Sequence, residues 1–476
     1  MKPRVIALAV LLSVFAVGLS AAEPIRLHPG NPHYFLWRGQ PTVLITSAEH
    51  YGALLNLDFD YAKYLDTLTR DGLNLTRVFS GAYCEDPTAF KITNNTLAPL
   101  PGKLIAPWAR SDAPGYANGG NKFDLTKWDA AYFQRLKALV AQASRRGIVV
   151  EFTLFCPFYR EEMWLRSPMN AANNVNGVGT VARGEVYTLD RHGGLLAVQE
   201  AMVRKIVSEL RDADNVMWEV CNEPYTGKPR LVAPEWEQHM AAVVAEAERS
   251  LGPGHWPHLI TQNIANGKQR IENPPPAVSV FNFHYANPPQ TVAMNYALNK
   301  PIGDNETGFK GTADAHYRME AWEFLLAGGA LFNHLDYSFT AGHEDGTFAY
   351  PEKTPGGGNA GLRRQIRVLA EFMRSFDFTR MHPDPSVVKT GVSDKGRVQA
   401  LTEPGRQYAI YLKGNPLRAV AIALPAARYR AEWVDVQSGE ISARPAMHHA
   451  GGDASFEPPF GAEEVALRIR SVAAQQ

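Results

Sequence analysis

The chain has 476 residues, and its 48 basic residues are balanced by 48 acidic ones. A net charge of zero argues against a nucleic-acid partner or an anionic membrane surface, for which a basic excess would be expected. Hydrophobic residues make up 45% and charged residues 20% of the chain, which is typical of a soluble globular protein, and the length allows two or three domains.

The first 22 residues have the pattern of a secretory signal peptide. Lys2 and Arg4 precede a mostly aliphatic run over residues 5–19, and Ser20, Ala21 and Ala22 supply the small residues of a cleavage site. The run is shorter than the roughly 20 apolar residues that a membrane-spanning helix needs. We therefore predict export to the periplasm or the extracellular space after cleavage near Ala22, with no membrane anchor.

From residue 41 onward, eight short and mostly apolar runs alternate with helical stretches. The strand candidates are residues 42–46, 73–79, 148–155, 216–221, 258–262, 278–283, 301–303 and 330–334. The clearest helices are residues 124–146, 195–210 and 236–251, and a glycine follows the first and the third. Eight strand–helix repeats predict an α/β fold, a (β/α)8 TIM barrel, over residues 23–380.

After residue 375 the pattern changes to short alternating runs separated by Gly, Pro and Asn. Residues 382–385, His-Pro-Asp-Pro, have the composition of a linker, and strand-like runs follow up to residue 469. This pattern is typical of a small antiparallel β-sandwich, which we place at residues 386–472. We expect this second domain to support the barrel or to bind polysaccharide, since it has no obvious catalytic constellation.

Two glutamates follow two of the predicted barrel strands. Asn222-Glu223-Pro224 comes after the run 215–221, and Asn305-Glu306-Thr307 comes after residues 300–304. Active sites of (β/α)8 barrels lie at the carboxyl ends of the strands, so both side chains should face one cavity. Cleavage of a glycosidic bond needs two such groups: an acid for the leaving oxygen, and a carboxylate that attacks the anomeric carbon or activates water.

These motifs resemble those of the clan A glycoside hydrolases, close to the cellulase-like enzymes of family 5. The matching segments are Trp218-Glu-Val-Cys-Asn-Glu-Pro224, Asp304-Asn-Glu-Thr-Gly308, Phe281-Asn-Phe-His-Tyr285 and Leu73-Asn-Leu-Thr-Arg77. The resemblance covers roughly residues 30–375. The C-terminal part resembles the β-sandwich appended to many bacterial members.

The resemblance implies a role for each matching residue. Glu223 would be the acid/base and Glu306 the nucleophile of a retaining mechanism, because the carboxyl groups of this clan lie about 5–5.5 Å apart. Asn222 would contact the sugar 2-hydroxyl. Glu306 must be ionised to attack, so we expect a cation and hydrogen-bond donors to lower its pKa, whereas burial and a neighbouring negative charge should raise the pKa of Glu223.

Three further residues match positions that support the nucleophile in this family. Arg77 would hold the nucleophile ionised, and His284 with Tyr285 would form an imidazole and aromatic pair whose tyrosine hydroxyl contacts the nucleophile. Glu219 lies four residues before Glu223, so it should point into the barrel, where we expect a structural ion-pair or hydrogen-bond partner.

Other residues near strand ends are candidates for contacts with substrate hydroxyls. Glu49 and His50 follow the first strand, and His334 and Asp336 accompany the eighth. The family usually carries a tryptophan after strand eight, and residues 332–337 contain none, which leaves the subsite shape and the substrate open.

Two long loops, residues 79–124 and 156–193, should overhang the catalytic face. Aromatic rings stack on the apolar face of a sugar, which makes Tyr83, Trp108, Tyr159 and Trp164 candidate sugar platforms. Packing within the loops is the alternative for each of them.

No metal or organic cofactor is predicted. A metal-dependent barrel hydrolase often has a His-x-His pair after strand one, and this chain has Glu49-His50-Tyr51. Cys84, Cys156 and Cys221 fit no zinc or redox motif, and the sequence leaves open whether two of them form a disulfide.

The sequence therefore predicts a carbohydrate substrate, without an obligate protein partner. A transglycosylase with the same residues and a carbohydrate-binding barrel without catalysis remain as alternatives. The sugar, the linkage and the choice between endo and exo action stay open.

Overall fold

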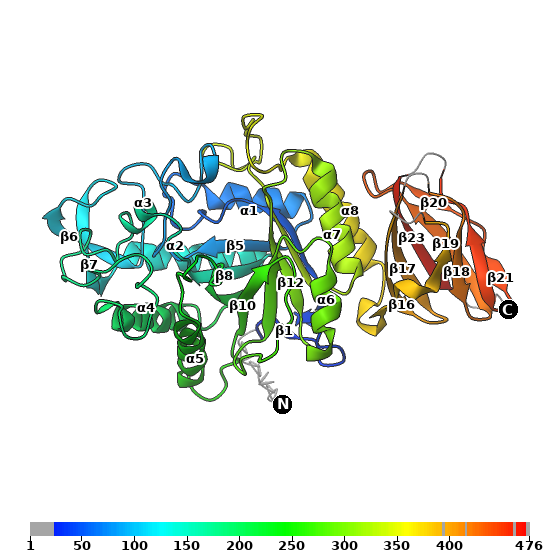
Figure 1. The fold of residues 1–476 in the computed structure, drawn as a ribbon, viewed down its shortest axis with the longest axis horizontal. Coiled ribbons are helices and arrows are strands. Elements are labelled where there is room, and N and C mark those ends of the chain that lie inside the picture. Colours follow the sequence, from blue (N-terminus) through cyan, green and yellow to red (C-terminus); the bar gives the residue numbers. More distant parts are fainter. Residues whose placement is uncertain (1–22, 393–395, 415–416, 460–462, 473–476) are drawn as a thin grey trace, which may run out of the picture.

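The structure, a computed structural model of the chain, describes residues 23–392, 396–414, 417–459 and 463–472. The predicted signal peptide, with its cleavage site near Ala22, lies outside the described residues. The described part is a (β/α)8 barrel followed by an antiparallel β-sandwich, as the sequence pattern predicts (Figure 1). Within it, we find no helix with the length and apolar character needed to traverse a bilayer.

Eight parallel strands form the wall of the barrel. They are β4 (Leu44–Ala48), β5 (Leu75–Phe79), β8 (Val149–Phe155), β9 (Val216–Cys221), β10 (Leu259–Asn266), β11 (Val280–His284), β12 (Ile302–Thr307) and β13 (Leu331–Leu335). Their hydrogen-bonded order is β4-β13-β12-β11-β10-β9-β8-β5. Seven of the eight are buried along their whole length, because helices and loops cover the outer face while side chains fill the interior.

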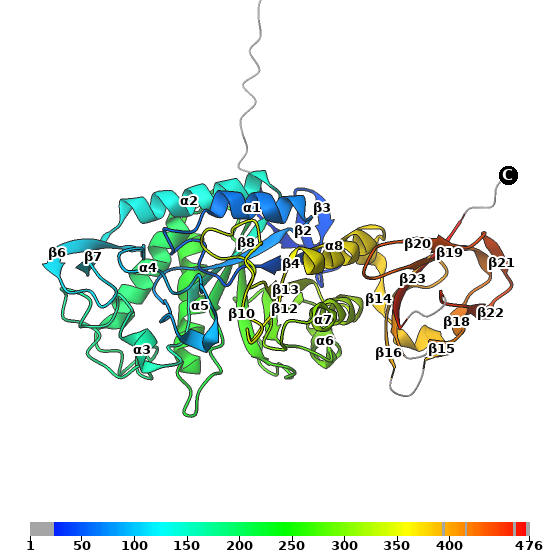
Figure 2. The same ribbon diagram turned by 90° about the horizontal axis from the view of Figure 1, so that it is seen from above.

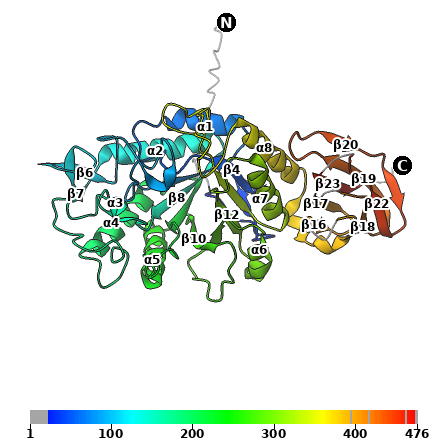
Figure 3. The same ribbon diagram turned by 45° about the horizontal axis from the view of Figure 1, so that its top comes forward.

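The helices pack around this sheet, as Figures 2 and 3 show from two sides. They are α1 (Tyr61–Arg70), α2 (Ala130–Arg145), α3 (Glu161–Trp164), α4 (Leu195–Glu209), α5 (Pro234–Ser250), α6 (Gln290–Asn295), α7 (Asp314–Leu326) and α8 (Ala360–Arg374). A short antiparallel sheet of β1 (Arg26–Leu27), β2 (Phe35–Trp37) and β3 (Gln40–Thr42) precedes the barrel.

Three predicted element boundaries were wrong by four residues or more, one of them the end of the strand predicted at 258–262, which continues to Asn266. Residues 121–128 form the strand β7 (Asn121–Trp128), which pairs with β6 (Trp108–Pro114), so the helix predicted from residue 124 begins only at Ala130. Asp129 caps this helix, because its side chain accepts the free N–H groups of Ala131 and Tyr132. The strand predicted at 301–303 extends to Thr307, because pairing with β11 and β13 continues up to that residue.

The barrel closes between β4 and β5 through one side chain. The Asn74 side chain accepts the N–H of Ile45 (2.8 Å) and donates to the carbonyl of Val43 (2.9 Å). Two main-chain bonds support the closure at its ends. The backbone N–H of Asn74 donates to the carbonyl of Ile45, and the backbone N–H of Phe79 donates to the carbonyl of Tyr51. An asparagine amide has one acceptor and one donor group, so it can replace a pair of ladder bonds.

The C-terminal domain consists of two antiparallel sheets. One has the order β14 (His382–Pro383), β16 (Arg397–Glu403), β17 (Gln407–Lys413), β23 (Glu464–Ser471), β19 (Ala427–Val434) and β20 (Ile441–Ala443), and β21 (Met447–His449) also pairs with β19. The other has the order β15 (Val388–Thr390), β18 (Val420–Leu424) and β22 (Gly452–Phe456). Because β14 pairs with β16, half of the predicted linker 382–385 belongs to a sheet.

The sandwich packs against the barrel beyond α7 and α8 (Figure 1). Trp322 on α7 stacks on Tyr411 of β17, with ring centroids 5.8 Å apart. Arg318, also on α7, makes an ion pair of 2.7 Å with Glu464 of β23, and both side chains are buried. These apolar and ionic contacts hold the two domains together.

Candidate active site

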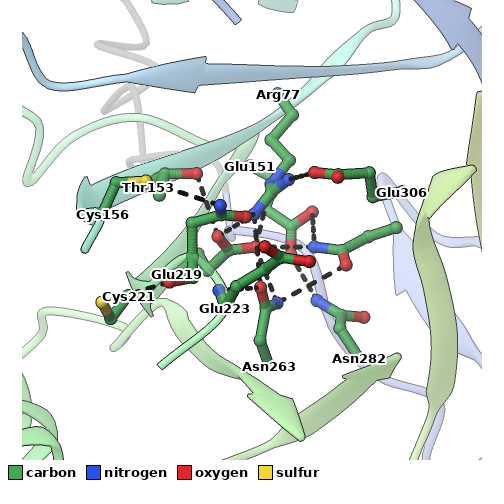
Figure 4. A network of polar contacts seen from close by, with 12 residues as sticks. Arg77, Glu151, Thr153, Cys156, Glu219, Cys221, Glu223, Asn263, Asn282 and Glu306 are labelled. Carbon is green, nitrogen blue, oxygen red and sulfur yellow. Dashed lines mark hydrogen bonds and ion pairs between the residues drawn. The ribbon is translucent and has the colours of Figure 1, made fainter. Parts of the chain in front are cut away.

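The carboxyl ends of the barrel strands bring Glu223 and Glu306 together. Glu223 follows β9 directly, and Glu306 lies near the end of β12, with β10 and β11 between the two strands. One oxygen of each carboxylate and one ring nitrogen of His284 lie within 4.8 Å of one another. Figure 4 shows the two glutamates with the polar network that surrounds Arg77.

Three donors hold the carboxylate of Glu306. Tyr285 donates its hydroxyl to Oε1 at 2.5 Å, while Tyr51 and Arg77 approach Oε2, each at 3.1 Å. The contacts of Tyr285 and Arg77 are those that the resemblance implies. Tyr51 is an additional donor, which the sequence gave no reason to choose. Three charge-assisted bonds from fixed groups orient both oxygens.

Arg77 connects Glu306 to a second, fully buried carboxylate. Its guanidinium makes a bidentate ion pair with Glu219, in which Nε lies 3.0 Å from Oε2. Arg77 also donates to Oδ1 of Asn222 at 2.6 Å, and its guanidinium lies over the ring of Tyr51. The planar guanidinium therefore has a fixed orientation. Glu219 is the structural partner that its position in the strand predicts.

Amides and a hydroxyl from neighbouring strands complete the hydrogen bonding of Glu219 (Figure 4). Asn305 donates at 2.6 Å, and Thr153 and Asn263 each donate at 3.2 Å. Glu151 lies in the same interior and accepts bonds from side chains of β10, β11 and β12. Burial, together with the negative charge of Glu219, raises the pKa of Glu151 to about 7.

Glu223 has its own set of donors. His284 Nδ1 lies 3.1 Å from Oε1, and the Tyr159 hydroxyl donates to Oε2 at 2.8 Å. The backbone N–H of Glu223 donates to Asn263, and Asn222 donates to the Tyr159 hydroxyl at 2.7 Å. The acid/base candidate therefore has its own donors, and its network joins that of Glu306 through His284, whose Nδ1 also lies 3.6 Å from Glu306 Oε1, and through Asn222, which accepts from Arg77.

The expected direction of the Glu223 pKa was wrong for the free protein. Burial alone would raise this pKa, but the hydrogen bond and charge of His284, together with the Tyr159 hydroxyl, lower it below its ordinary value. His284 is fully buried, which would lower its pKa, yet the charges of Glu306 and Glu223 raise it. Glu223 and His284 therefore titrate as a pair that can hold the proton that a general acid must deliver.

The two carboxylates and His50 line one pocket. It is lined by His50, Tyr51, Phe79, Glu85, Phe90, Leu97, Cys156, Tyr159, Asn222, Glu223, Tyr285, Glu306 and Phe309. Of the sequence candidates, Asn222, Tyr285, His50 and Tyr159 therefore reach the cavity with the catalytic pair. Burial would lower the pKa of His50, but the carboxylates of Glu85, Glu306 and Glu49 raise it.

Three predicted substrate contacts are buried away from this pocket. Glu49 turns back to accept from the N–H groups of Gly52 and Ala53 and from Thr96. His334 is buried beneath Tyr317, with ring centroids 3.9 Å apart, and burial lowers its pKa to about 4.

Asp336, the third of these predicted substrate contacts, makes a buried ion pair of 2.8 Å with Arg363 of α8. These three assignments were wrong because the side chains satisfy the barrel's own polar groups.

The tryptophan candidates are also packed inside the loops. Trp164 is 1% exposed and donates its indole N–H to the carbonyl of Val181, so it cannot serve as a sugar platform. Trp108 is fully buried as well. The hydroxyl of the buried Tyr83 donates to Glu85 at 2.9 Å, which places Tyr83 behind the pocket lining.

Backbone strain is concentrated around the pocket. Among the described residues, nine non-glycine residues have positive φ, and five of them line the pocket: Tyr51, Phe90, Glu223, Tyr285 and Phe309. This left-handed conformation is costly for bulky side chains and persists where the surrounding structure enforces it, most often at ligand sites.

The described residues contain two clusters with metal-ligand chemistry. One is the catalytic group Glu223, His284 and Glu306. The other is Glu248, His255 and His258 near the start of β10, at the opposite end of the barrel. In that second cluster both imidazoles bond directly to Glu248, so the groups satisfy one another. All three cysteines are buried free thiols.

No protein-family model and no curated protein matches the chain. Solved structures do match it. A glycoside hydrolase family 5 structure from Bacteroides vulgatus ATCC 8482 has a TM-score of 0.65 at 14% identity, over 95% of each chain. A structure described as a glycoside hydrolase has a TM-score of 0.65 at 13% identity, over 95% of this chain and 98% of that one. The chain therefore has the fold of glycoside hydrolase family 5 structures, including the C-terminal domain.

Proposed function

We propose that the protein is a retaining glycosidase, which hydrolyses β-glycosidic bonds of an oligo- or polysaccharide. The observation that carries this proposal is the facing pair of carboxylates, with oxygens of Glu223 and Glu306 within 4.8 Å in one pocket. Retaining enzymes have carboxyl groups about 5–5.5 Å apart, whereas inverting enzymes need about 6.5–9.5 Å to admit a water molecule. A direct attack by Glu306 fits this spacing.

In the first step, Glu306 attacks the anomeric carbon and the bond to the leaving oxygen breaks. Arg77, Tyr51 and Tyr285 hold both oxygens of the nucleophile, so little reorganisation is needed before attack. The leaving oxygen takes a proton from Glu223, and the imidazolium of His284, 3.1 Å away, replenishes that proton. The product of this step is a glycosyl ester on Glu306.

In the second step, water attacks the anomeric carbon and gives its proton to Glu223, which releases Glu306. Formation of the ester removes the negative charge of Glu306, which is one of the charges that raise the pKa of His284. When hydrolysis frees the Glu306 carboxylate, its charge returns and raises the basicity of His284 again, so the proton taken from water by Glu223 is retained by the Glu223–His284 pair. The carboxylate of Glu306 and the acid are both restored.

Variants of the two carboxylates test this function. Glu223→Ala and Glu306→Ala should each reduce hydrolysis of an aryl β-glycoside by about 100-fold or more, whereas Glu162→Ala, an exposed residue of α3, should not. Added azide should rescue the two variants with opposite product anomers, which NMR distinguishes. Equal activity of all variants, or an inverted product from the wild type, would refute the mechanism.

Two parts of the proposal need separate tests. A transglycosylase would use the same residues, so adding acceptor sugars and measuring the ratio of transfer to hydrolysis distinguishes the two activities. Export after cleavage near Ala22 is tested by sequencing the N-terminus of the protein recovered from the periplasm or the medium.

A further inference from the structure

Aromatic side chains from several loops line the active-site pocket, which bears on how a sugar chain can enter it. Phe90, from the loop after β5, reaches the ring of Tyr159 at 5.5 Å and that of Phe309 at 6.1 Å, both edge to face. Phe309, after β12, also contacts the rings of Tyr285 and Tyr337. These rings connect the segments after β5, β8 and β12 around the pocket that contains the catalytic pair.

Two aromatic residues of the pocket lining, Phe90 and Phe309, have a strained backbone. Phe90 and Phe309 both have positive φ, +51° and +57°, and Phe309 is 39% exposed although it is a large apolar side chain. Strain of this kind, together with an exposed ring beside a pocket, indicates a ligand contact rather than core packing. A sugar ring offers an apolar face of matching size.

The inner wall of the pocket carries polar groups whose hydrogen bonding is incomplete. His50 and Glu85 are 7% and 3% exposed, and both line the pocket. Neither ring nitrogen of His50 has a hydrogen-bond partner, and Nε2 lies 3.6 Å from Glu85, too far for such a bond. Tyr83 and Asn95 hold the Glu85 carboxylate from behind. A ligand hydroxyl would complete the hydrogen bonding of this pair.

The wall lies directly beside the nucleophile. His50 precedes Tyr51, which donates to Glu306, and the two rings stack at 5.5 Å. The same sugar whose anomeric carbon faces Glu306 therefore meets the wall. On the acid side, the Tyr225 hydroxyl lies 3.4 Å from Glu223 and bonds to the exposed Asn266.

We propose that the pocket binds one sugar residue at the non-reducing end of the substrate, so that the enzyme is exo-acting. His50 and Glu85 hydrogen-bond hydroxyls of this terminal residue, and Phe90 and Phe309 enclose its apolar face. Any chain extension beyond the terminal residue would collide with the wall. This inference rests on the proposed glycosidase activity and adds to it the class of substrate: unblocked non-reducing chain ends.

Binding to an inactive variant tests the proposal without requiring turnover. In the Glu306→Gln background, gluco-, manno- and xylo-trisaccharides with β-linkages are titrated calorimetrically in three forms: unmodified, reduced to the alditol, and O-methylated at the terminal non-reducing residue. For the sugar that binds, the unmodified and reduced forms should bind equally, and the methylated form at least about tenfold more weakly. Equal binding of the methylated form would overturn exo action.

A matched pair of variants then tests the wall. Glu85→Gln, added to the same background, should weaken binding of the unmodified sugar by about 10- to 100-fold, whereas Glu162→Gln should not change it. An unchanged affinity of the Glu85 variant would refute the assignment of the wall. A different result would refute the proposed glycosidase activity itself: a wild type that cleaves no aryl β-glycoside, together with an inactive variant that binds no sugar.

Discussion

The floor and the wall of the active site are built in opposite ways. The floor consists of Arg77 and Glu219 with the groups bonded to them, and nearly every polar atom there has a partner within the protein. In the wall, His50 Nε2 lies 3.6 Å from Glu85, and neither ring nitrogen of His50 has a hydrogen-bond partner. A buried network that is already complete keeps its geometry without substrate, whereas an incomplete one gains bonds when a ligand arrives. We therefore expect the floor to serve mainly catalysis and the wall mainly recognition, whereas Asn222, which is bonded to Arg77 and lines the pocket, belongs to both.

The largest effect is expected from breaking the floor. Arg77→Met leaves Glu219 buried without its cation, which should lower the free energy of unfolding by about 3–5 kcal/mol. Activity should fall by about 100-fold or more, because Glu306 loses an orienting donor. Urea denaturation and aryl glycoside kinetics measure both effects, with Arg211→Met on the surface as the control. If Arg77→Met were as stable as the wild type, the hydrogen-bond network around Arg77 and Glu219 would not be cooperative.

A smaller effect should appear in the pH dependence of stability. Burial raises the folded-state pKa of Glu151 from 4.5 to about 7, so the folded protein binds more protons than the unfolded chain between these values. Its contribution to stability therefore decreases as pH rises from about 4.5 to 7. Glu151→Gln should flatten this part of the profile in urea denaturation at pH 5 and pH 7. An unchanged slope would show that another group causes it.

The wall should respond differently from the floor. His50→Gln removes an imidazole that has no hydrogen-bond partner and only a 3.6 Å ion pair with Glu85, so the free energy of unfolding should fall by about 1 kcal/mol, less than in Arg77→Met. KM for the substrate should nevertheless rise about tenfold, while kcat changes less. If this variant were destabilised as much as Arg77→Met, the distinction between floor and wall would be lost.

The smallest expected effect is spectroscopic. The charges of Glu306 and Glu223 raise the pKa of His284, so Glu223→Gln should lower it, although Glu306 continues to raise it. NMR titration of the imidazole signals follows this change, and His284→Asn identifies the signal. The signals of exposed histidines such as His316 should not move. A His284 pKa that stays constant would show that the two groups do not share a proton.

The sequence predicts the barrel and the catalytic pair because both depend on local patterns. Strands buried on both faces are continuous apolar runs, and their order in the chain is also their order in the sheet. Glu223 and Glu306 were found because each lies at the carboxyl end of such a run. Arg77 and Tyr285 followed from the resemblance of their segments.

The rest of the site depends on tertiary contacts that a linear pattern does not contain. Glu85, Phe90 and Phe309 lie in loops, and the left-handed backbone of the two phenylalanines is enforced by their neighbours. Position after a strand does not determine where a side chain turns: Glu49 bonds to its own turn, while His50 beside it lines the pocket. Likewise, the lowered pKa of Glu223 depends on the charge of His284, 61 residues away.

The closure at Asn74 has a consequence for how the site is assembled. Strand β5 carries Arg77, and the segment that follows it carries Glu85 and Phe90, so one stretch of chain delivers parts of both the reaction chemistry and the substrate selection. On its β4 side, this stretch is fastened largely by a single amide side chain. Asn74 therefore helps to align the catalytic residue Arg77 and the pocket residues Glu85 and Phe90, although its own side chain bonds, among the described residues, only to the backbone of β4 and of the residue before it.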